Sequence, residues 1–82
     1  LSDGRLCLIY GYRGEGAGLR YSISSDLGIS WDREIILRDD AGNHDVGYPR
    51  AIERPDGNVV AVYYHNDLAD GERYIAATIW KP

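Results

Sequence analysis

The stretch Ser24-Ser25-Asp26-Leu27-Gly28-Ile29-Ser30-Trp31 predicts a tight, polar hairpin turn that ends on a large aromatic residue. Residues 19–24 lead into it with alternating apolar and polar side chains, the pattern of a strand with one buried face. Within the turn, Asp26 can accept backbone N–H groups and Gly28 can take a positive φ. Trp31 can fold its ring back over the turn. The stretch therefore fixes a hairpin and the frame of the strands around it.

The spacing Ser-x-Asp-x-Gly-x-Ser-Trp resembles the Asp box, the repeat of bacterial neuraminidases in the sialidase superfamily. In that family the box marks a β-hairpin in a propeller blade and does not mark a catalytic centre. The resemblance therefore implies a structural role for five residues: Ser24, Asp26, Gly28, Ser30 and Trp31.

The composition narrows the classes of partner. The chain has 82 residues and a formal net charge of −4, which argues against nucleic acid and anionic membrane surfaces as partners. No apolar run is long enough to span a bilayer. Cys7 is the single cysteine, and its apolar neighbours favour a small buried core residue over a reactive thiol. The compartment stays open, a secreted or periplasmic parent protein being one expectation.

The remaining sequence reads as strands and loops. We expect a turn at Pro55-Asp56-Gly57-Asn58, because Pro fixes φ near the value that a turn requires and Gly can take a positive φ. No window has a convincing helical period, so the chain is predicted to be all-β. Six segments are expected to be strands, at 6–10, 19–24, 34–37, 48–54, 59–64 and 74–80.

The chain also repeats itself at a shift of 53 residues without a gap. A period near 50 with several strands per unit is typical of propeller blades. Residues that recur in both copies are expected to serve architecture. By this rule Arg20, which falls on Arg73, is favoured as a structural residue. Arg13 falls on Asn66 and has no counterpart, so a binding role and a solvated loop position both stay open.

Together these features predict an all-β fragment of a six-bladed sialidase-type β-propeller. Residues 1–37 would supply strands two to four of one blade, with the Asp box at 24–31, and residues 48–82 would supply strands one to three of the next. This amounts to about one and a half blades of antiparallel four-stranded units. The missing N-terminal blades are the expected partner. A ring of several copies is disfavoured, because two strands would be lacking at every junction.

A second stretch with family resemblance is Asp45-Val46-Gly47-Tyr48-Pro49-Arg50. It is similar to the segment that opens an innermost strand near the end of sialidase propellers, where Tyr48 matches the catalytic tyrosine. The stretch before the Asp box resembles the arginine-bearing segment of the same proteins, which implies that Arg13 together with Arg20 binds substrate. Asp45 could line the same pocket or belong to a polar turn, the turn being favoured.

The chemistry that the resemblance implies is glycoside hydrolysis with a Tyr nucleophile. The carboxylate of a sialic acid would repel a carboxylate nucleophile, whereas a neutral phenol avoids that repulsion. A phenol has a pKa near 10 and needs a neighbouring base, which in the family is a Glu from an earlier blade. Arginines hold the substrate carboxylate through bidentate hydrogen bonds. That Glu and the family's acid/base Asp are not among these residues, and no metal or cofactor is implied.

One departure from the family pattern concerns the strand after the Asp-Gly turn. In many sialidases it ends in Tyr-Glu, and the Glu braces a substrate-binding Arg; here the pair is Tyr63-Tyr64.

The leading hypothesis is that the chain is part of a sialidase-like exo-glycosidase that hydrolyses terminal sugars of glycans, and that the chain alone is inactive. The alternative is a non-catalytic, carbohydrate-binding Asp-box propeller.

Overall fold

The computed structural model describes residues 1–82 and confirms the all-β class. All six predicted strands are present, and the first runs on to Tyr12, which shortens the loop that follows it. No helix is long and apolar enough to cross a membrane. The strands are β1 (Leu6–Tyr12), β2 (Gly18–Ser24), β3 (Ile35–Arg38), β4 (Gly47–Glu53), β5 (Val59–His65) and β6 (Tyr74–Trp80).

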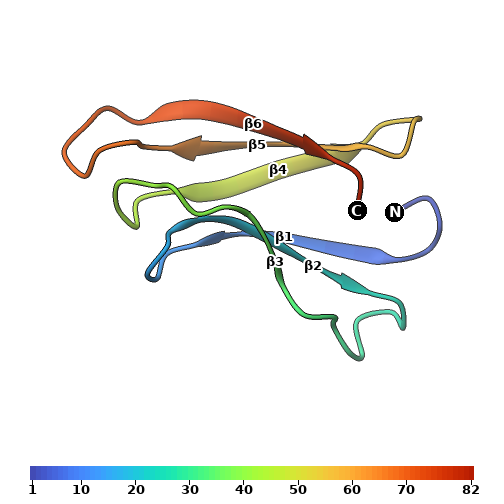
Figure 1. The fold of residues 1–82 in the computed structure, drawn as a ribbon. Coiled ribbons are helices and arrows are strands. Elements are labelled where there is room, and N and C mark those ends of the chain that lie inside the picture. Colours follow the sequence, from blue (N-terminus) through green and yellow to red (C-terminus); the bar gives the residue numbers. More distant parts are fainter.

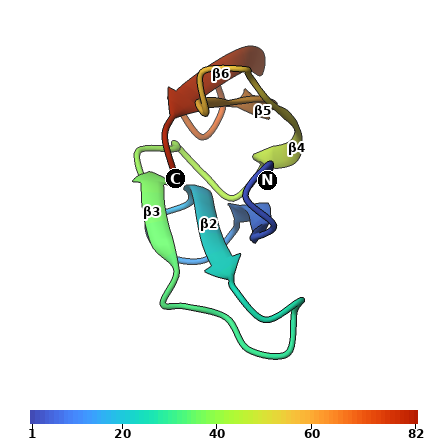
Figure 2. The same ribbon diagram turned by 90° about the vertical axis from the view of Figure 1, so that its right-hand side faces the viewer.

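The strands form two antiparallel sheets of three strands each, in the orders β1-β2-β3 and β4-β5-β6. Each strand pairs with its neighbour in the sequence, so hairpins build both sheets. Figure 1 shows the second sheet lying over the first, and Figure 2 shows the same two layers after a quarter turn. The chain crosses from one sheet to the other between β3 and β4, and both termini lie at the same end.

The core lies between the facing sides of the two sheets. Leu19 of β2 and Ala61 of β5 are fully buried, and Tyr63 packs beside them. The rings of Tyr21 and Trp80 also meet across the layers, with centroids 5.3 Å apart. Full burial of a large apolar side chain is worth about 1.5–3 kcal/mol. These contacts form the apolar part of the packing between the two sheets.

The opposite face of the second sheet is apolar and lies open. Val60 pairs with both Ile52 and Ile79, so the three side chains share one face. Val62 and Ile75 continue that face, and all except the half-buried Val60 are exposed. An apolar surface of this kind is typical of an interaction site.

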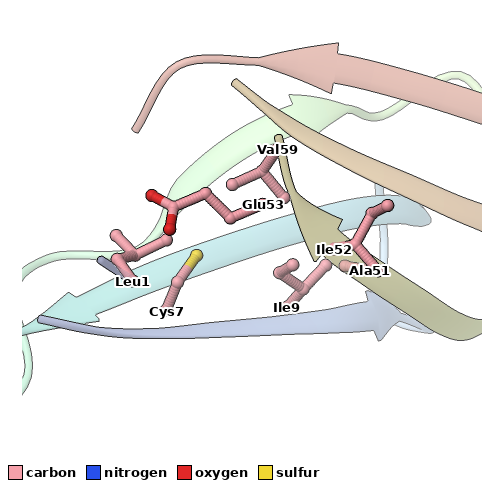
Figure 3. A pocket seen from close by; sticks show the side chains of 7 residues that line it. All are labelled: Leu1, Cys7, Ile9, Ala51, Ile52, Glu53 and Val59. Carbon is pink, nitrogen blue, oxygen red and sulfur yellow. The ribbon is translucent and has the colours of Figure 1, made fainter. Parts of the chain in front are cut away.

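An apolar hollow of about 260 Å³ opens between β1 and β4 near the chain termini (Figure 3). Cys7 and Ile9 point into it from β1, and Val59 faces them from β5. Cys7 is half-buried, where full burial was predicted. Burial raises the pKa of its thiol, as expected for an unreactive cysteine.

The Asp box forms the predicted turn. The Asp26 carboxylate accepts the backbone N–H of Ser30 at 2.9 Å and the hydroxyl of Ser24 at 2.8 Å. The Ser24 hydroxyl in turn accepts the N–H of Gly28, which has a φ of 88°. A Cβ built on Gly28 would lie 3.8 Å from the Trp31 ring, so that ring does fold over the turn.

The gapless repeat holds for the first strand of each hairpin and is wrong beyond it. β1 and β5 are related by the shift of 53 residues, but the loop between β5 and β6 is longer than the loop between β1 and β2. Tyr10 pairs with Arg20, whereas its counterpart Tyr63 pairs with Ala76. Arg73 lies before β6, so it does not correspond to Arg20, and the repeat gives no reason to assign Arg20 to architecture.

His65 was predicted to lie in a loop, but it ends β5 and is fully buried. Neither ring nitrogen has a hydrogen bond, although Asp40 Oδ1 lies 3.5 Å from Nε2. The rings of Tyr63 and Tyr74 meet it edge-on. Burial, together with the charge of the nearby Arg38, lowers the pKa of His65. A neutral imidazole therefore packs between the layers.

The bonds to Ser30 and Ser24 lower the pKa of Asp26 to about 2, so its contribution to stability is present above the unfolded pKa of about 4 and is lost as the pH falls towards 2. Asp26→Asn should therefore be less stable than the wild type at pH 7, with a smaller difference near pH 2.5. Urea unfolding midpoints at both pH values measure this. Asp32→Asn is the matched control, because that exposed side chain makes none of these bonds. A difference for Asp26→Asn that does not depend on pH would contradict the account.

Burial of His65 also makes the stability of the protein depend on pH, because it lowers the pKa of this side chain. The unfolded chain takes up a proton near pH 6.5 that the folded chain resists, so stability should fall as the pH drops from 7 to 5. His65→Phe should flatten this part of the profile, measured as thermal midpoints at several pH values. The exposed His44 provides the control His44→Gln, which should keep the wild-type slope. An unchanged slope in His65→Phe would show that another group causes the acid sensitivity.

Candidate functional site

The candidate site lies at the end of the molecule opposite the termini. The β1–β2 loop, the β3–β4 connection and the β5–β6 loop gather there, at the left in Figure 1. Hydrogen bonds join them: Gly42 donates its N–H to the Asn66 carbonyl, and the Asn66 side chain donates to Asn43 and to the Asp45 carbonyl, both at 3.0 Å. Asn66 is fully buried. The Asp box lies at the other end of the first sheet, away from the site.

The start of β4 has an unusual backbone. Gly47 has a φ of 121° and Tyr48 a φ of 51°, a left-handed value that residues with a Cβ rarely adopt. The pairing with β5 is interrupted by a bulge between Gly47 and Arg50. Gly47 also lies against Gly11 of β1, where an added Cβ would come within 2.7 Å of the Gly47 Cα. Tyr48, the next residue along β4, is 77% exposed.

Arg13 lies directly beside Tyr48. Its Cζ is 5.6 Å from the centroid of the Tyr48 ring, within the range of a cation–π contact. Its Nε donates to the Val46 carbonyl at 3.2 Å, and its Nη2 donates to the Tyr64 hydroxyl at 3.1 Å. The Tyr64 ring stacks on Tyr48 with centroids 5.7 Å apart. The structure thus brings Arg13 and Tyr48 together, with Tyr64 touching both.

Asp45 belongs to the same group of side chains but is engaged by protein partners. The Tyr64 hydroxyl donates to its Oδ1 at 2.8 Å, and Arg73 Nε donates to its Oδ2 at 2.7 Å. Arg73 first and Tyr64 second lower the pKa of Asp45. Burial and the bond to Asp45 raise the pKa of Tyr64. Asp45 therefore stays ionised and Tyr64 stays a neutral phenol near neutral pH.

A hollow of about 440 Å³ opens between the ends of β1 and β4, and we call it the Tyr48 hollow. None of its lining residues is acidic. The polar and charged side chains among them are Tyr10, Arg13, Tyr48 and Arg50. A site with two guanidinium groups and no carboxylate favours an anionic ligand.

Arg20 does not line the Tyr48 hollow. Its guanidinium lies 3.4 Å from the centre of the Tyr12 ring and forms an ion pair with Glu34, and its side chain is only 13% exposed. Glu34 also accepts a hydrogen bond from Tyr10, which raises the pKa of that phenol. Arg13 and Arg20, paired as substrate-binding candidates from the sequence, thus have separate partners.

Sequence reasoning missed the roles of Tyr64 and Arg73 in the site. Tyr64 drew notice only as the residue in place of a Glu, and Arg73 only as the apparent counterpart of Arg20. A stronger signal was available in the pair of tyrosines at the end of β5, since residue 64 lies on the same face of the strand as the exposed Val62.

These side chains can bind and orient a ligand, but none of them is a free proton acceptor beside Tyr48. Asp45, the carboxylate nearest in this group, already accepts bonds from Tyr64 and Arg73. No three His, Cys, Asp or Glu side chains gather in a way that could hold a metal ion. The chemistry that these residues can supply is therefore a cation, an exposed phenol and two stacked aromatic rings.

Comparison with models of protein families found no match, and comparison with curated proteins found none either. Among solved structures, the chain is similar to a protein from Dyadobacter fermentans whose structure is described as that of an unknown function protein. The two are 37% identical and superpose with a TM-score of 0.80. The match covers 96% of this chain and 22% of that chain, so this chain spans about a fifth of the length of the solved protein.

Proposed function

We propose that the two sheets are parts of consecutive blades of a six-bladed sialidase-type propeller. Three observations support this. The Asp-box hairpin joins β2 to β3, as the predicted frame requires. The exposed face around Val60 and Ile52 is a surface that a neighbouring blade would cover. About one and a half blades make a quarter of a six-bladed ring, close to the 22% of the solved chain that the match covers.

We propose, as the function of that propeller, a sialidase-like exo-glycosidase acting on terminal, acidic sugars. The observation that carries the proposal is the contact of Arg13 with the exposed Tyr48 at a hollow that has no acidic residue in its lining. A nucleophile for a sugar with a carboxylate at its anomeric carbon must be neutral before it attacks and close to a cation that holds the carboxylate. Tyr48 supplies a phenol in place of a carboxylate, and Arg13 beside it supplies the cation.

In this proposal each residue has one task. Arg13 binds the substrate carboxylate through the guanidinium edge that its protein bonds leave free. Tyr48 attacks the anomeric carbon through its hydroxyl as the glycosidic bond breaks, and its proton passes to a base. The departing oxygen takes a proton from an acid, and water then cleaves the bond between the sugar and Tyr48; these residues supply neither the base nor the acid. The positive φ of Tyr48 fixes the ring at the mouth of the hollow, where Tyr64 supports one face. Strained backbone at an exposed side chain is a frequent feature of functional sites.

A non-catalytic, carbohydrate-binding propeller is the second candidate. The observation that favours it is the lack of a free carboxylate next to Tyr48, since Asp45 is held by Tyr64 and Arg73. Arg13 and the stacked tyrosines would then bind a sugar acid without hydrolysing it. The two candidates share the ligand and differ in the presence of a base.

The change Tyr48→Phe separates them, made in the longest native chain that contains these residues. With a fluorogenic sialoside as the substrate, we expect turnover to fall by at least about a thousandfold, because the nucleophile is lost while its ring remains. Affinity for free N-acetylneuraminic acid should change little, because Arg13 is intact. Tyr74→Phe is the control, since that hydroxyl bonds Asp67 and lies outside the Tyr48 hollow.

The other outcomes are equally informative. Unchanged turnover in Tyr48→Phe would remove Tyr48 from the mechanism. Wild-type protein that binds the sugar acid through Arg13 but never hydrolyses the sialoside would establish the binding propeller. Wild-type protein that neither binds nor hydrolyses would exclude both candidates.

A further inference from the structure

The Tyr64 hydroxyl lies between a cation and an anion that do not touch each other. It accepts a hydrogen bond from Arg13 Nη2 at 3.1 Å and donates one to Asp45 Oδ1 at 2.8 Å. Asp45 is in turn bound by Arg73 at 2.7 Å. Four side chains from four separate segments thus form one chain of hydrogen bonds that ends at the Tyr48 hollow.

The direction of the bonds in this chain is fixed. A phenol has one O–H donor, and an ionised carboxylate can only accept, so the Tyr64 proton must point to Asp45. Its lone pairs are then turned towards Arg13, which can only donate. Charge at both ends polarises the hydroxyl and strengthens both bonds. The geometry therefore offers Arg13 a rigid acceptor rather than a rotating hydroxyl.

Arg13 needs such an acceptor because little else restrains it. It lies on the short β1–β2 loop and is exposed, and a free Arg side chain loses rotamer entropy when it is held in one position. Apart from Tyr64, its hydrogen-bond partner is the Val46 carbonyl at 3.2 Å, which holds Nε only. The bond from Nη2 to Tyr64 adds a second fixed point to the bond from Nε, and two such bonds together restrict rotation of the guanidinium.

A neutral acceptor has a second effect on the charge of the site. A carboxylate in direct contact with Arg13 would neutralise it, and a ligand anion would then have to compete with that carboxylate. Here Asp45 interacts with Arg13 only through the Tyr64 hydroxyl, and its charge is paired with that of Arg73. Arg13 is therefore held in place while its charge stays available to a ligand.

We propose that Tyr64 is the positioning residue of the site, orienting Arg13 for an anionic ligand by relaying the charge of Asp45 through its hydroxyl. Asp45 then acts through Tyr64 and does not contact the ligand. The nature of the ligand, a sugar carboxylate, rests on the proposed function, whereas the orientation of Arg13 is a property of the free protein. The two parts can therefore be tested separately.

The test compares wild type, Tyr64→Phe and Asp45→Asn by NMR of the arginine side chains without ligand. In the wild type, the bond to Tyr64 should slow rotation of the Arg13 guanidinium and give two resolved Nη signals. Tyr64→Phe keeps the ring stacked on Tyr48 but should merge those signals. Asp45→Asn keeps the phenol and weakens the relay, so it should broaden them and lower the pKa of Tyr64. Tyr74→Phe is the matched control and should match the wild type.

Binding is then measured by calorimetry with free N-acetylneuraminic acid as the probe. Loss of one hydrogen bond to a charged group should weaken binding of the acid by about tenfold in Tyr64→Phe. Merged signals together with weaker binding support the whole proposal. Merged signals in a protein whose wild type does not bind the acid support the positioning role and refute the sugar-acid ligand. Two resolved Nη signals in both Tyr64→Phe and Asp45→Asn would overturn the proposal, whatever the affinity.

Discussion

The contact on which the site depends is the close approach of Gly11 to Gly47. A Cβ on Gly11 would lie 2.7 Å from the Gly47 Cα, so no other residue fits there without moving a strand. The packing of Leu19 and Ala61 brings the two sheets together, and the glycine contact lets the start of β4 come close to the end of β1. This approach brings Arg13 of the β1–β2 loop next to the ring of Tyr48 in β4.

The Asp box and the candidate site lie at opposite ends of the molecule. At one end, three hydrogen bonds within Ser24–Ser30 shape the turn of the Asp box, and Asp32 closes the hairpin by donating its N–H to the Ile23 carbonyl at 2.8 Å. At the other, three loops from both sheets meet around the buried Asn66. The Asp-box end shapes a local turn, and the end around Asn66 carries the side chains that a ligand could reach. This separation agrees with the common placement of binding residues on loops that a rigid scaffold holds.

Features decided within a few residues could be predicted from the sequence, and features decided between sheets could not. Alternation, apolar runs and turn signals together predicted all six strands, and the turn around Asp26 was predicted down to its acceptor role. The gapless repeat failed because a longer loop before β6 changes the pairing without changing the local pattern. The positions of Arg20 and Tyr64 depend on partners in other strands. Contact between Arg13 and Tyr64, 51 residues apart, has no local signal.

The local bonding of the Asp box also has a consequence for the order in which the chain folds. Its hydrogen bonds join residues no more than four apart, so closing this loop costs little entropy and can occur within microseconds. The Arg13–Tyr64 contact spans 51 residues and requires both sheets to have docked. We therefore expect the hairpin to be structured in the folding transition state, and the end that carries Arg13 and Tyr64 to form last. During synthesis of the chain, the same hairpin would emerge and close before β4 exists to complete the site.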